Sequence, residues 1–368
     1  MRIALLAHPR HPIRPPFMGG MEAHAWSLAK GLEARGHEVT LFASGDSDAS
    51  IRVHPVIPFH YEREWPAGDW HGTEALNAFT DAIWTDAIPA IRSGDFDVVH
   101  NNTVHRFPPR LSCRVRVPMV TSLHVPPFEV LRRAVHDSEA PWHIVTVTSA
   151  QQKDRWWEEA PPTARVVPNG IGPALWPFSH RGDGSAVWVG RIHPNKGTGL
   201  AARAARRAGV PLTIYGTMED PGYYAAEVVP HLGDGVAYGG HLSGRELAAA
   251  LGRASVLLFT PMWDEPFGLA AIEGMACGLP VAAFRNGAVE EVVGPCGRYA
   301  VPGDVEGLAS ALHAALDLDR RASRARVEAR FTLDGMIAAY ETLYAEVACA
   351  RDADWPEVTY TPRELSAV

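Results

Sequence analysis

The chain alternates between short apolar runs and helical stretches, and this alternation limits its possible folds more than any other feature of the sequence. The pattern begins at residue 2, stops in a stretch rich in proline and glycine, and restarts near residue 186. Strands that alternate with helices form parallel sheets with helices on both faces. We therefore predict two doubly wound, Rossmann-like α/β domains. The apolar runs are 2–8, 38–44, 97–102, 119–124 and 143–149 in the first half, and 186–192, 211–216, 236–240, 256–261 and 280–284 in the second.

The domain boundary is predicted in the Pro- and Gly-rich linker 161–178, so that residues 1–170 form the first domain and 171–335 the second. A length of 368 residues suits two domains, and a hydrophobic content of 46% gives each a core. Ligands of doubly wound sheets bind at the carboxyl ends of the strands. We expect the functional residues at those ends, in a cleft shared by the two domains.

The charge and the cysteines exclude some classes of function. The net charge of −8 argues against a nucleic-acid partner, which normally meets a basic surface. The four cysteines form no CxxC pair, so they read as reduced thiols of a cytoplasmic protein. The first residues resemble a strand rather than a signal peptide, and no apolar stretch approaches the length of a membrane span.

The segment 264–283, DEPFGLAAIEGMACGLPVAA, is the most informative motif. Pro266 suits a first helical turn, so the N–H groups of Phe267, Gly268 and Leu269 are predicted to form an anion site at a helix N-terminus. Glu265 and Glu273 flank that turn and lie eight positions, roughly 12 Å, apart along a helix. The carboxylate pair of a retaining glycosidase lies only about 5 Å apart, so these two glutamates cannot easily share one anomeric carbon. Taken singly, either glutamate could equally be a cap or a solvated side chain.

A second motif, VWVGRIHPNKG at 187–197, ends a strand in Gly190 and opens a helix between two cations. Arg191 offers a planar fork of donors and Lys196 a point charge, a combination that can neutralise a diphosphate without a metal. The alternative is a surface turn whose charges are only solvated. No His/Cys cluster has metal-ligand spacing, so we predict no metal site.

Two further features lie in the first half. Gly19 and Gly20 precede a helix at the mouth of the first strand, where a backbone can approach a ligand closely, and His24 falls in the first turn of that helix. The segment is not a GxGxxG fingerprint, so no nicotinamide cofactor is predicted. His124 ends a strand, where a neutral imidazole could donate a hydrogen bond to a sugar hydroxyl. His100 and His105 are interpreted as structural histidines.

Together these motifs resemble the family-4 retaining glycosyltransferases of the GT-B fold, and the resemblance covers nearly the whole chain. It implies that Glu265, with the backbone at Phe267 and Gly268, contacts the donor sugar and that Glu273 binds the ribose. It implies a diphosphate clamp of Arg191 and Lys196, with Gly19 and Gly20 closing over it. His124 resembles the histidine beside the reacting carbon. The resemblance also implies a final helix, about 336–360, that crosses back onto the first domain, and an Asn-Gly hinge at Asn169 and Gly170.

The activity implied is metal-independent transfer of a sugar from a UDP-, GDP-, ADP- or dTDP-sugar to a small-molecule or glycan acceptor, with retention and without a cofactor. The sequence departs from the family at 286–293, NGAVEEVV, where a Gly-Gly-x-Pro-Glu segment is common. Three alternatives stay open: an epimerase or hydrolase on the same fold, a non-catalytic nucleotide-sugar sensor, and a metal-dependent transferase that uses Asp-x-Asp. The last pattern occurs at 46–48, 95–97, 317–319 and 352–354, as a short pattern does by chance.

Overall fold

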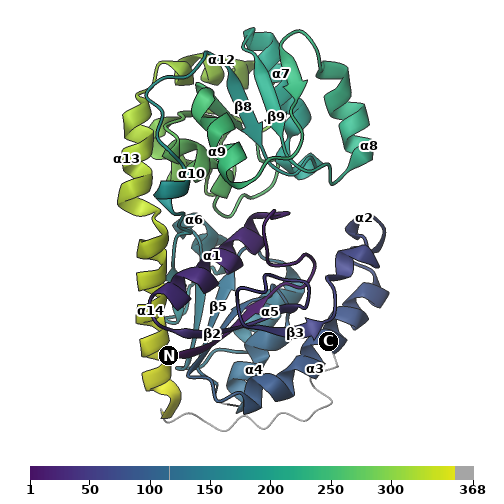
Figure 1. Cartoon of the computed structure of the whole chain (residues 1–368), viewed down its shortest axis with the longest axis vertical. Helices are drawn as coiled ribbons and strands as arrows, with labels where there is room; N and C mark the ends of the chain where they lie inside the picture. Colours follow the sequence, from purple (N-terminus) through teal and green to yellow (C-terminus); the bar gives the residue numbers. More distant parts are fainter. Residues whose placement is uncertain (116, 353–368) are drawn as a thin grey trace. The chain divides into compact units, whose positions relative to one another are not determined.

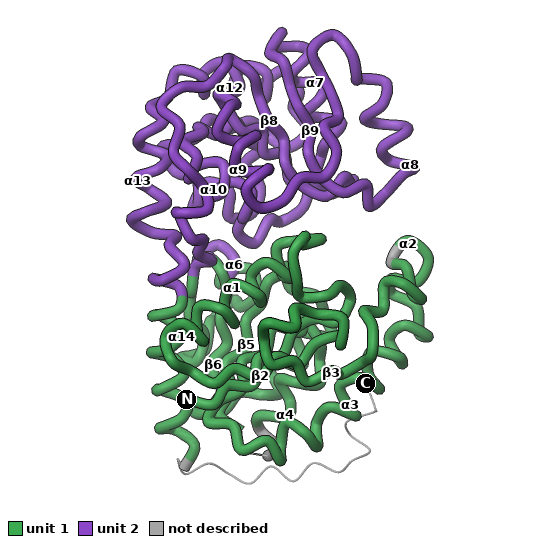
Figure 2. The backbone as a smooth tube through the Cα atoms, viewed as in Figure 1, with its two compact units in different colours: residues 1–148, 153–167, 337–368 green, residues 149–152, 168–336 purple. Residues whose placement is uncertain are grey.

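The computed structural model describes residues 1–115 and 117–352, which form two compact units (Figure 2). Unit 1 comprises Met1–Thr148, Lys153–Val167 and the chain from Ile337 on, and unit 2 comprises Ser149–Gln152 and Pro168–Met336. The predicted terminal helix beyond residue 352 and the aspartate at 354 lie outside the described residues. The side chain of Cys113 is likewise not described, whereas Cys277, Cys296 and Cys349 are free thiols.

Unit 1 contains a seven-stranded sheet of order β3-β2-β1-β4-β5-β6-β7, and each of its described pairings is parallel. Strand β1 of this sheet is apolar on both faces because helices cover both, and its residues Ile3, Leu5 and Leu6 are wholly buried. The strands are β1 (Arg2–Ala7), β2 (Glu38–Ser44), β3 (Val53–Ile57), β4 (Val98–Asn102), β5 (Met119–Leu123), β6 (His143–Val147) and β7 (Ala164–Val166). The helices are α1 (Gly20–Ala34), α2 (Ala67–Trp70), α3 (Glu74–Ser93), α4 (Phe107–Val115), α5 (Glu129–His136) and α6 (Ala150–Trp156).

Helix α14 (Leu333–Cys349, labelled in Figure 1) begins in unit 2 and from Ile337 on belongs to unit 1 (Figure 2). It packs closely on α1, because a Cβ atom at Gly31 would lie only 2.1 Å from Ile337 Cδ1. The hydroxyl groups of Tyr340 and Tyr344 reach buried polar groups of the sheet, namely Ser122 Oγ at 3.0 Å and His100 Nδ1 at 2.6 Å. The last helix thus completes the core of unit 1.

Unit 2 repeats the architecture with a six-stranded parallel sheet of order β10-β9-β8-β11-β12-β13. Two apolar clusters, one on each face, bury its central strands. The strands are β8 (Ala186–Val189), β9 (Leu212–Tyr215), β10 (Val236–Tyr238), β11 (Val256–Phe259), β12 (Val281–Phe284) and β13 (Gly297–Ala300). The helices are α7 (Thr198–Ala208), α8 (Pro221–Tyr223), α9 (Gly244–Arg253), α10 (Leu269–Ala276), α11 (Val289–Val293), α12 (Val305–Leu316) and α13 (Arg320–Arg330). The prediction of two Rossmann-like α/β domains is confirmed.

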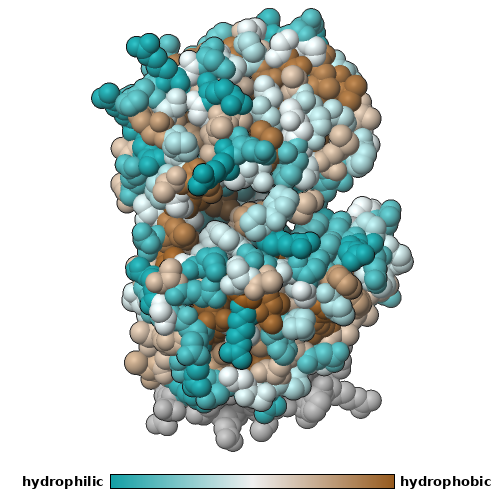
Figure 3. Space-filling model, viewed as in Figure 1, coloured by the Kyte–Doolittle hydropathy of each residue, from teal (hydrophilic) through white to brown (hydrophobic). Residues whose placement is uncertain are grey.

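On the face shown in Figure 3, hydrophilic and apolar residues are interspersed over both units. Within residues 1–115 and 117–352, no helix has both the length and the apolar character needed to cross a membrane.

Candidate functional site

Lys196 lies in the turn between β8 and α7, and contacts with Thr260 fix the backbone of this turn. Gly197 has a left-handed φ of 65°, and a Cβ atom there would lie 2.3 Å from the carbonyl oxygen of Thr260, so only glycine fits. Thr260 Oγ1 donates to the carbonyl oxygen of Lys196 at 2.8 Å and accepts from Trp188 Nε1 at 2.9 Å. Strand β8 and the segment after β11 therefore fix the position from which the Lys196 side chain extends.

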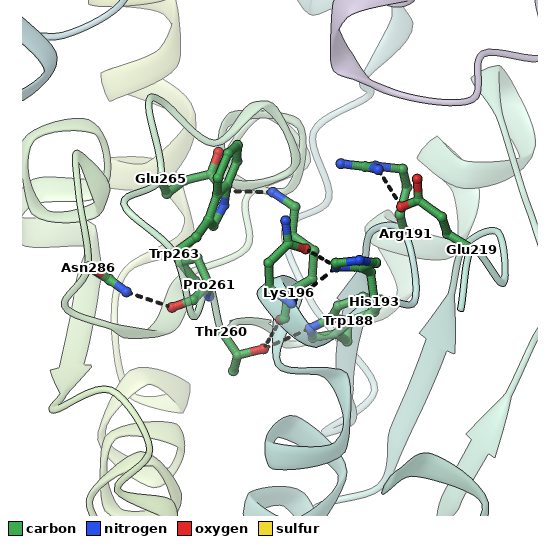
Figure 4. Close-up of polar contacts among 11 residues, drawn as sticks. Trp188, Arg191, His193, Lys196, Glu219, Thr260, Pro261, Trp263, Glu265 and Asn286 are labelled. Carbon is green, nitrogen blue, oxygen red and sulfur yellow. Dashed lines mark hydrogen bonds and ion pairs between the residues drawn. The ribbon is translucent and has the colours of Figure 1, made fainter. Parts of the chain in front are cut away.

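The ammonium group of Lys196 pairs with Glu265, 69 positions away in sequence (Figure 4). Lys196 Nζ donates to Glu265 Oε2 at 2.7 Å, and Trp263 Nε1 donates to the same oxygen at 2.7 Å. Lys196 Nζ also lies 4.8 Å from the centroid of the Trp263 ring, within range of a cation–π interaction. Glu265 is only 6% exposed, so this cation and this indole N–H compensate a carboxylate that is otherwise largely removed from water.

Arg191 also has a carboxylate partner, because its guanidinium forms an ion pair with Glu219 in the loop after β9 (Figure 4). The two loops that carry these residues meet closely: a Cβ atom at Gly216 would lie 1.7 Å from the carbonyl oxygen of Gly190. Both predicted phosphate-binding cations are therefore already neutralised in this structure. A diphosphate that bound here would have to share or displace their carboxylate partners, which the sequence motif alone does not indicate.

The predicted start of the helix at Pro266 is wrong. Gly268 has a left-handed φ of 98° and caps α10, which begins at Leu269. Pro266 precedes the helix, and its carbonyl oxygen accepts a hydrogen bond from Ser149 Oγ at 3.0 Å. Phe267 is 3% exposed, and its ring packs on that of Phe331. Among the predicted backbone donors, Leu269 is the one that lies in the first turn.

Glu273 lies in the second turn of α10 and is half-buried. Burial raises the pKa of its carboxyl group to about 8. Within the described residues its carboxyl group has no hydrogen-bonding partner, in contrast to Glu265. A partly exposed carboxyl group without a protein partner can accept hydrogen bonds from the hydroxyl groups of a ligand.

The segment that departs from the family pattern supports Glu265. Gly287 has a left-handed φ of 61°, and a Cβ atom there would lie 2.3 Å from the backbone nitrogen of Glu265. The N–H of Ala288 donates to the carbonyl oxygen of Glu265 at 2.8 Å, and Asn286 Nδ2 donates to the carbonyl oxygen of Pro261. Sequence reasoning missed this role, although the Asn-Gly pair at 286–287 is a recognisable turn signal.

The predicted residues of unit 1 lie at the start of α1 and directly after β5. Gly19 is the extended N-cap of α1 and Gly20 is the first residue of this helix. His124 directly follows β5, and its Nε2 lies 2.6 Å from Asn102 Oδ1 at the end of β4. Its ring centroid is 4.5 Å from that of His24, and burial lowers the pKa of His124 to about 4. His24, His124 and Asn102 therefore form one cluster in unit 1.

His100 and His105, interpreted from the sequence as structural histidines, contact other residues of unit 1. Buried His100 is held between Tyr344 OH at 2.6 Å and Ser122 Oγ at 2.8 Å, and burial lowers its pKa to about 3. His105 Nε2 lies 3.0 Å from Asp81 Oδ1.

In the Asp-x-Asp patterns at 46–48 and 95–97, the aspartates make contacts with other residues of unit 1. Asp46 contacts His60, Asp48 accepts from Trp26, and Asp95 and Asp97 pair with Arg2. In the part of the chain that the structure describes, no three His, Cys, Asp or Glu side chains converge as ligands of a metal ion.

Both units match known glycosyltransferase sequences. Residues 184–317 match the family described as glycosyl transferases group 1, and residues 18–175 match the family described as Glycosyltransferase Family 4. The chain belongs to glycosyltransferase family 4. This glycosyltransferase is 28% identical to a glycogen synthase of Mycobacterium tuberculosis over 97% of both chains. It is 28% identical to a D-inositol 3-phosphate glycosyltransferase of Mycolicibacterium smegmatis, over 92% of its own length and 90% of the relative.

Solved structures confirm the GT-B fold of the glycosyltransferase. A sucrose-phosphate synthase from Thermosynechococcus elongatus aligns with a TM-score of 0.75 at 22% identity, covering 95% of this chain and 99% of that one. Anabaena HepE in complex with UDP and glucose aligns with a TM-score of 0.71 at 20% identity, covering 94% and 100%. The predicted fold and the predicted enzyme class are therefore confirmed.

Proposed function

We propose that this glycosyltransferase moves a sugar from a nucleoside diphosphate donor to an acceptor hydroxyl, with retention and without a metal. The observation that carries the proposal is the fixed set of Lys196, Glu265 and Trp263 beside the first turn of α10. The set combines a cation for phosphate oxygens with a carboxylate for sugar hydroxyls. The donor class also fits Anabaena HepE, whose structures contain UDP or UDP-glucose. UDP-, GDP-, ADP- and dTDP-sugars are all candidates, and the acceptor is a small molecule or a glycan.

In unit 2, the diphosphate is held by Lys196 and Arg191, with the backbone at Gly190 allowing close approach. The N–H of Leu269 and the helix dipole of α10 add about half a positive charge. Glu265 accepts hydrogen bonds from the sugar, supported by the backbone at Phe267 and Gly268. Glu273 accepts from the ribose, since its carboxyl group is otherwise without a partner.

Unit 1 contributes His124 beside the reacting carbon and backbone contacts from Gly19 and Gly20. The buried free thiols Cys277 and Cys296 suit the reducing conditions of the cytoplasm, where we place the enzyme.

The chemistry requires no nucleophile from the protein. Glu265 is held by two donors on one oxygen, which lowers its tendency to attack a carbon atom. The acceptor hydroxyl instead approaches the face from which the diphosphate leaves, and the departing phosphate oxygen takes its proton. The enzyme stabilises the leaving group and positions the reactants.

A turnover assay followed by NMR tests this proposal. Each of the four nucleotide sugars is incubated with the enzyme, with and without a panel of hydroxyl acceptors. Transfer with the anomeric configuration of the donor kept supports the proposal. Inversion contradicts the front-face mechanism, sugar release without acceptor indicates a hydrolase, a changed sugar on the nucleotide indicates an epimerase, and binding without turnover indicates a sensor.

A further inference from the structure

We propose that Asn102 is a positioning residue that sets the tautomer of His124 and makes Nδ1 of that histidine a hydrogen-bond acceptor. Asn102 Oδ1 lies 2.6 Å from His124 Nε2. An amide oxygen only accepts hydrogen bonds, so the hydrogen of a neutral His124 has to be on Nε2. The lone pair is then on Nδ1, the ring nitrogen that remains for a ligand.

The environment of Asn102 points to this single task. Asn102 is the last residue of β4 and is 2% exposed, a position where an amide side chain is costly unless it is hydrogen-bonded. Among the described residues, the Asn102 side chain makes one hydrogen bond, and its partner is His124. The Asn102 Nδ2 atom is buried and has no partner among those residues. The neighbouring Asn101, in contrast, is tied to Thr103 and Thr121.

The groups around His124 keep it neutral. The His24 ring of α1 lies 4.5 Å away, and a proton on either imidazole raises the energy of a proton on the other. Tyr340 of α14 lies behind His24 at 6.4 Å between ring centroids, and His100 of β4 adds a third neutral imidazole. No carboxylate of the described chain hydrogen-bonds to these three rings. A neutral ring with a defined tautomer follows.

The consequence for the reaction rests on the proposed function. His124 was expected to donate a hydrogen bond to a sugar hydroxyl, but its N–H is directed at Asn102. His124 therefore accepts a hydrogen bond at Nδ1 from a hydroxyl of the donor sugar or the acceptor. This contact orients the hydroxyl group, and the histidine stays neutral throughout the reaction.

NMR on the unliganded enzyme tests the tautomer without any assay of activity. Protein labelled with ¹⁵N at histidine is used for long-range ¹H–¹⁵N correlation spectra, and the His124 signals are identified by their loss in His124→Asn. The expected spectrum is that of a neutral ring with hydrogen on Nε2. Asn102→Asp, which places a carboxylate beside Nε2, should raise the pKa of His124 by more than one unit. A hydrogen on Nδ1, or a pKa that Asn102→Asp leaves unchanged, would overturn the inference.

Kinetics then separates positioning from a merely structural role. Asn102→Ala should lower kcat on the order of tenfold, the equivalent of one hydrogen bond, with a smaller change in donor KM. His124→Asn keeps an amide near the position of Nδ1 and should retain more activity than His124→Gln, whose amide lies near that of Nε2. Greater activity in His124→Gln contradicts the assignment. An enzyme without transferase activity would refute the proposed function while leaving the NMR result on Asn102 valid.

Discussion

If Glu273 binds the ribose, as proposed, its raised pKa should make nucleotide binding depend on pH in a defined direction. The carboxyl group has a pKa of about 8 in the free enzyme, so roughly one-tenth of it is ionised at pH 7 and nine-tenths at pH 9. Ribose hydroxyls donate to the carboxylate and so bind the ionised form. If this contact is required, the dissociation constant of a bare nucleoside diphosphate should fall about tenfold between pH 7 and pH 9 and then level off.

Isothermal titration calorimetry with UDP, GDP and ADP, in excess EDTA, measures this dependence. The range above pH 7 is suitable because a phosphate group loses its last proton near a pKa of about 6. Buffers of different ionisation enthalpy should also reveal the release of close to one proton per nucleotide bound at pH 7. The Glu273→Gln side chain has nearly the same shape but does not titrate, so the affinity of this variant for the nucleotide should not change with pH. A flat profile in the unmodified enzyme, or an equal slope in Glu273→Gln, would refute the assignment of Glu273 to the ribose.

Four further predictions concern the charged groups of unit 2. Lys196→Ala should lower kcat by more than it raises the dissociation constant of the donor, because the leaving group gains charge in the transition state, and steady-state kinetics with calorimetry checks this. Glu265→Ala should weaken binding of the sugar-bearing donor only, whereas Glu273→Ala should also weaken binding of the bare nucleotide. Equal effects of each variant on both ligands would contradict the separate roles of the two glutamates. Glu219→Gln removes the internal partner of Arg191 and should tighten diphosphate binding severalfold; weaker binding would instead mean that Glu219 positions the arginine. Activity should persist in excess EDTA, and loss of activity restored by magnesium would make Asp264 and Glu265 metal ligands.

The central strands of both sheets could be predicted from sequence because they are buried on both faces and rich in apolar residues, although those of unit 1 also carry buried polar side chains such as His100 and Ser122. The edge strands β3, β7 and β13 were not predicted. They are short or partly exposed, so their residues alternate weakly and resemble loops. Propensity alone also placed the start of α10 too early, because the conformation of Gly268 depends on the burial of Phe267 against Phe331.

The site could be predicted as a list of residues but not as a set of contacts. The spacing of the motifs identifies Lys196, Arg191 and Glu265, yet the Lys196–Glu265 contact joins residues 69 positions apart. The pairing of Arg191 with Glu219 depends in turn on the close approach of Gly190 and Gly216. Such contacts follow from the order of strands in the sheet and leave no local signal in the sequence.

The place of α14 in the chain determines the order in which the enzyme can fold during synthesis. Unit 2 is complete once residue 336 has left the ribosome, whereas unit 1 lacks α14 until the residues up to Cys349 have followed. Until then Ser122 and His100 lack the tyrosine hydroxyls that they contact in the finished protein. The part of the chain made first is thus the last to be completed, and a product truncated before Ile337 contains a whole unit 2 and an unfinished unit 1.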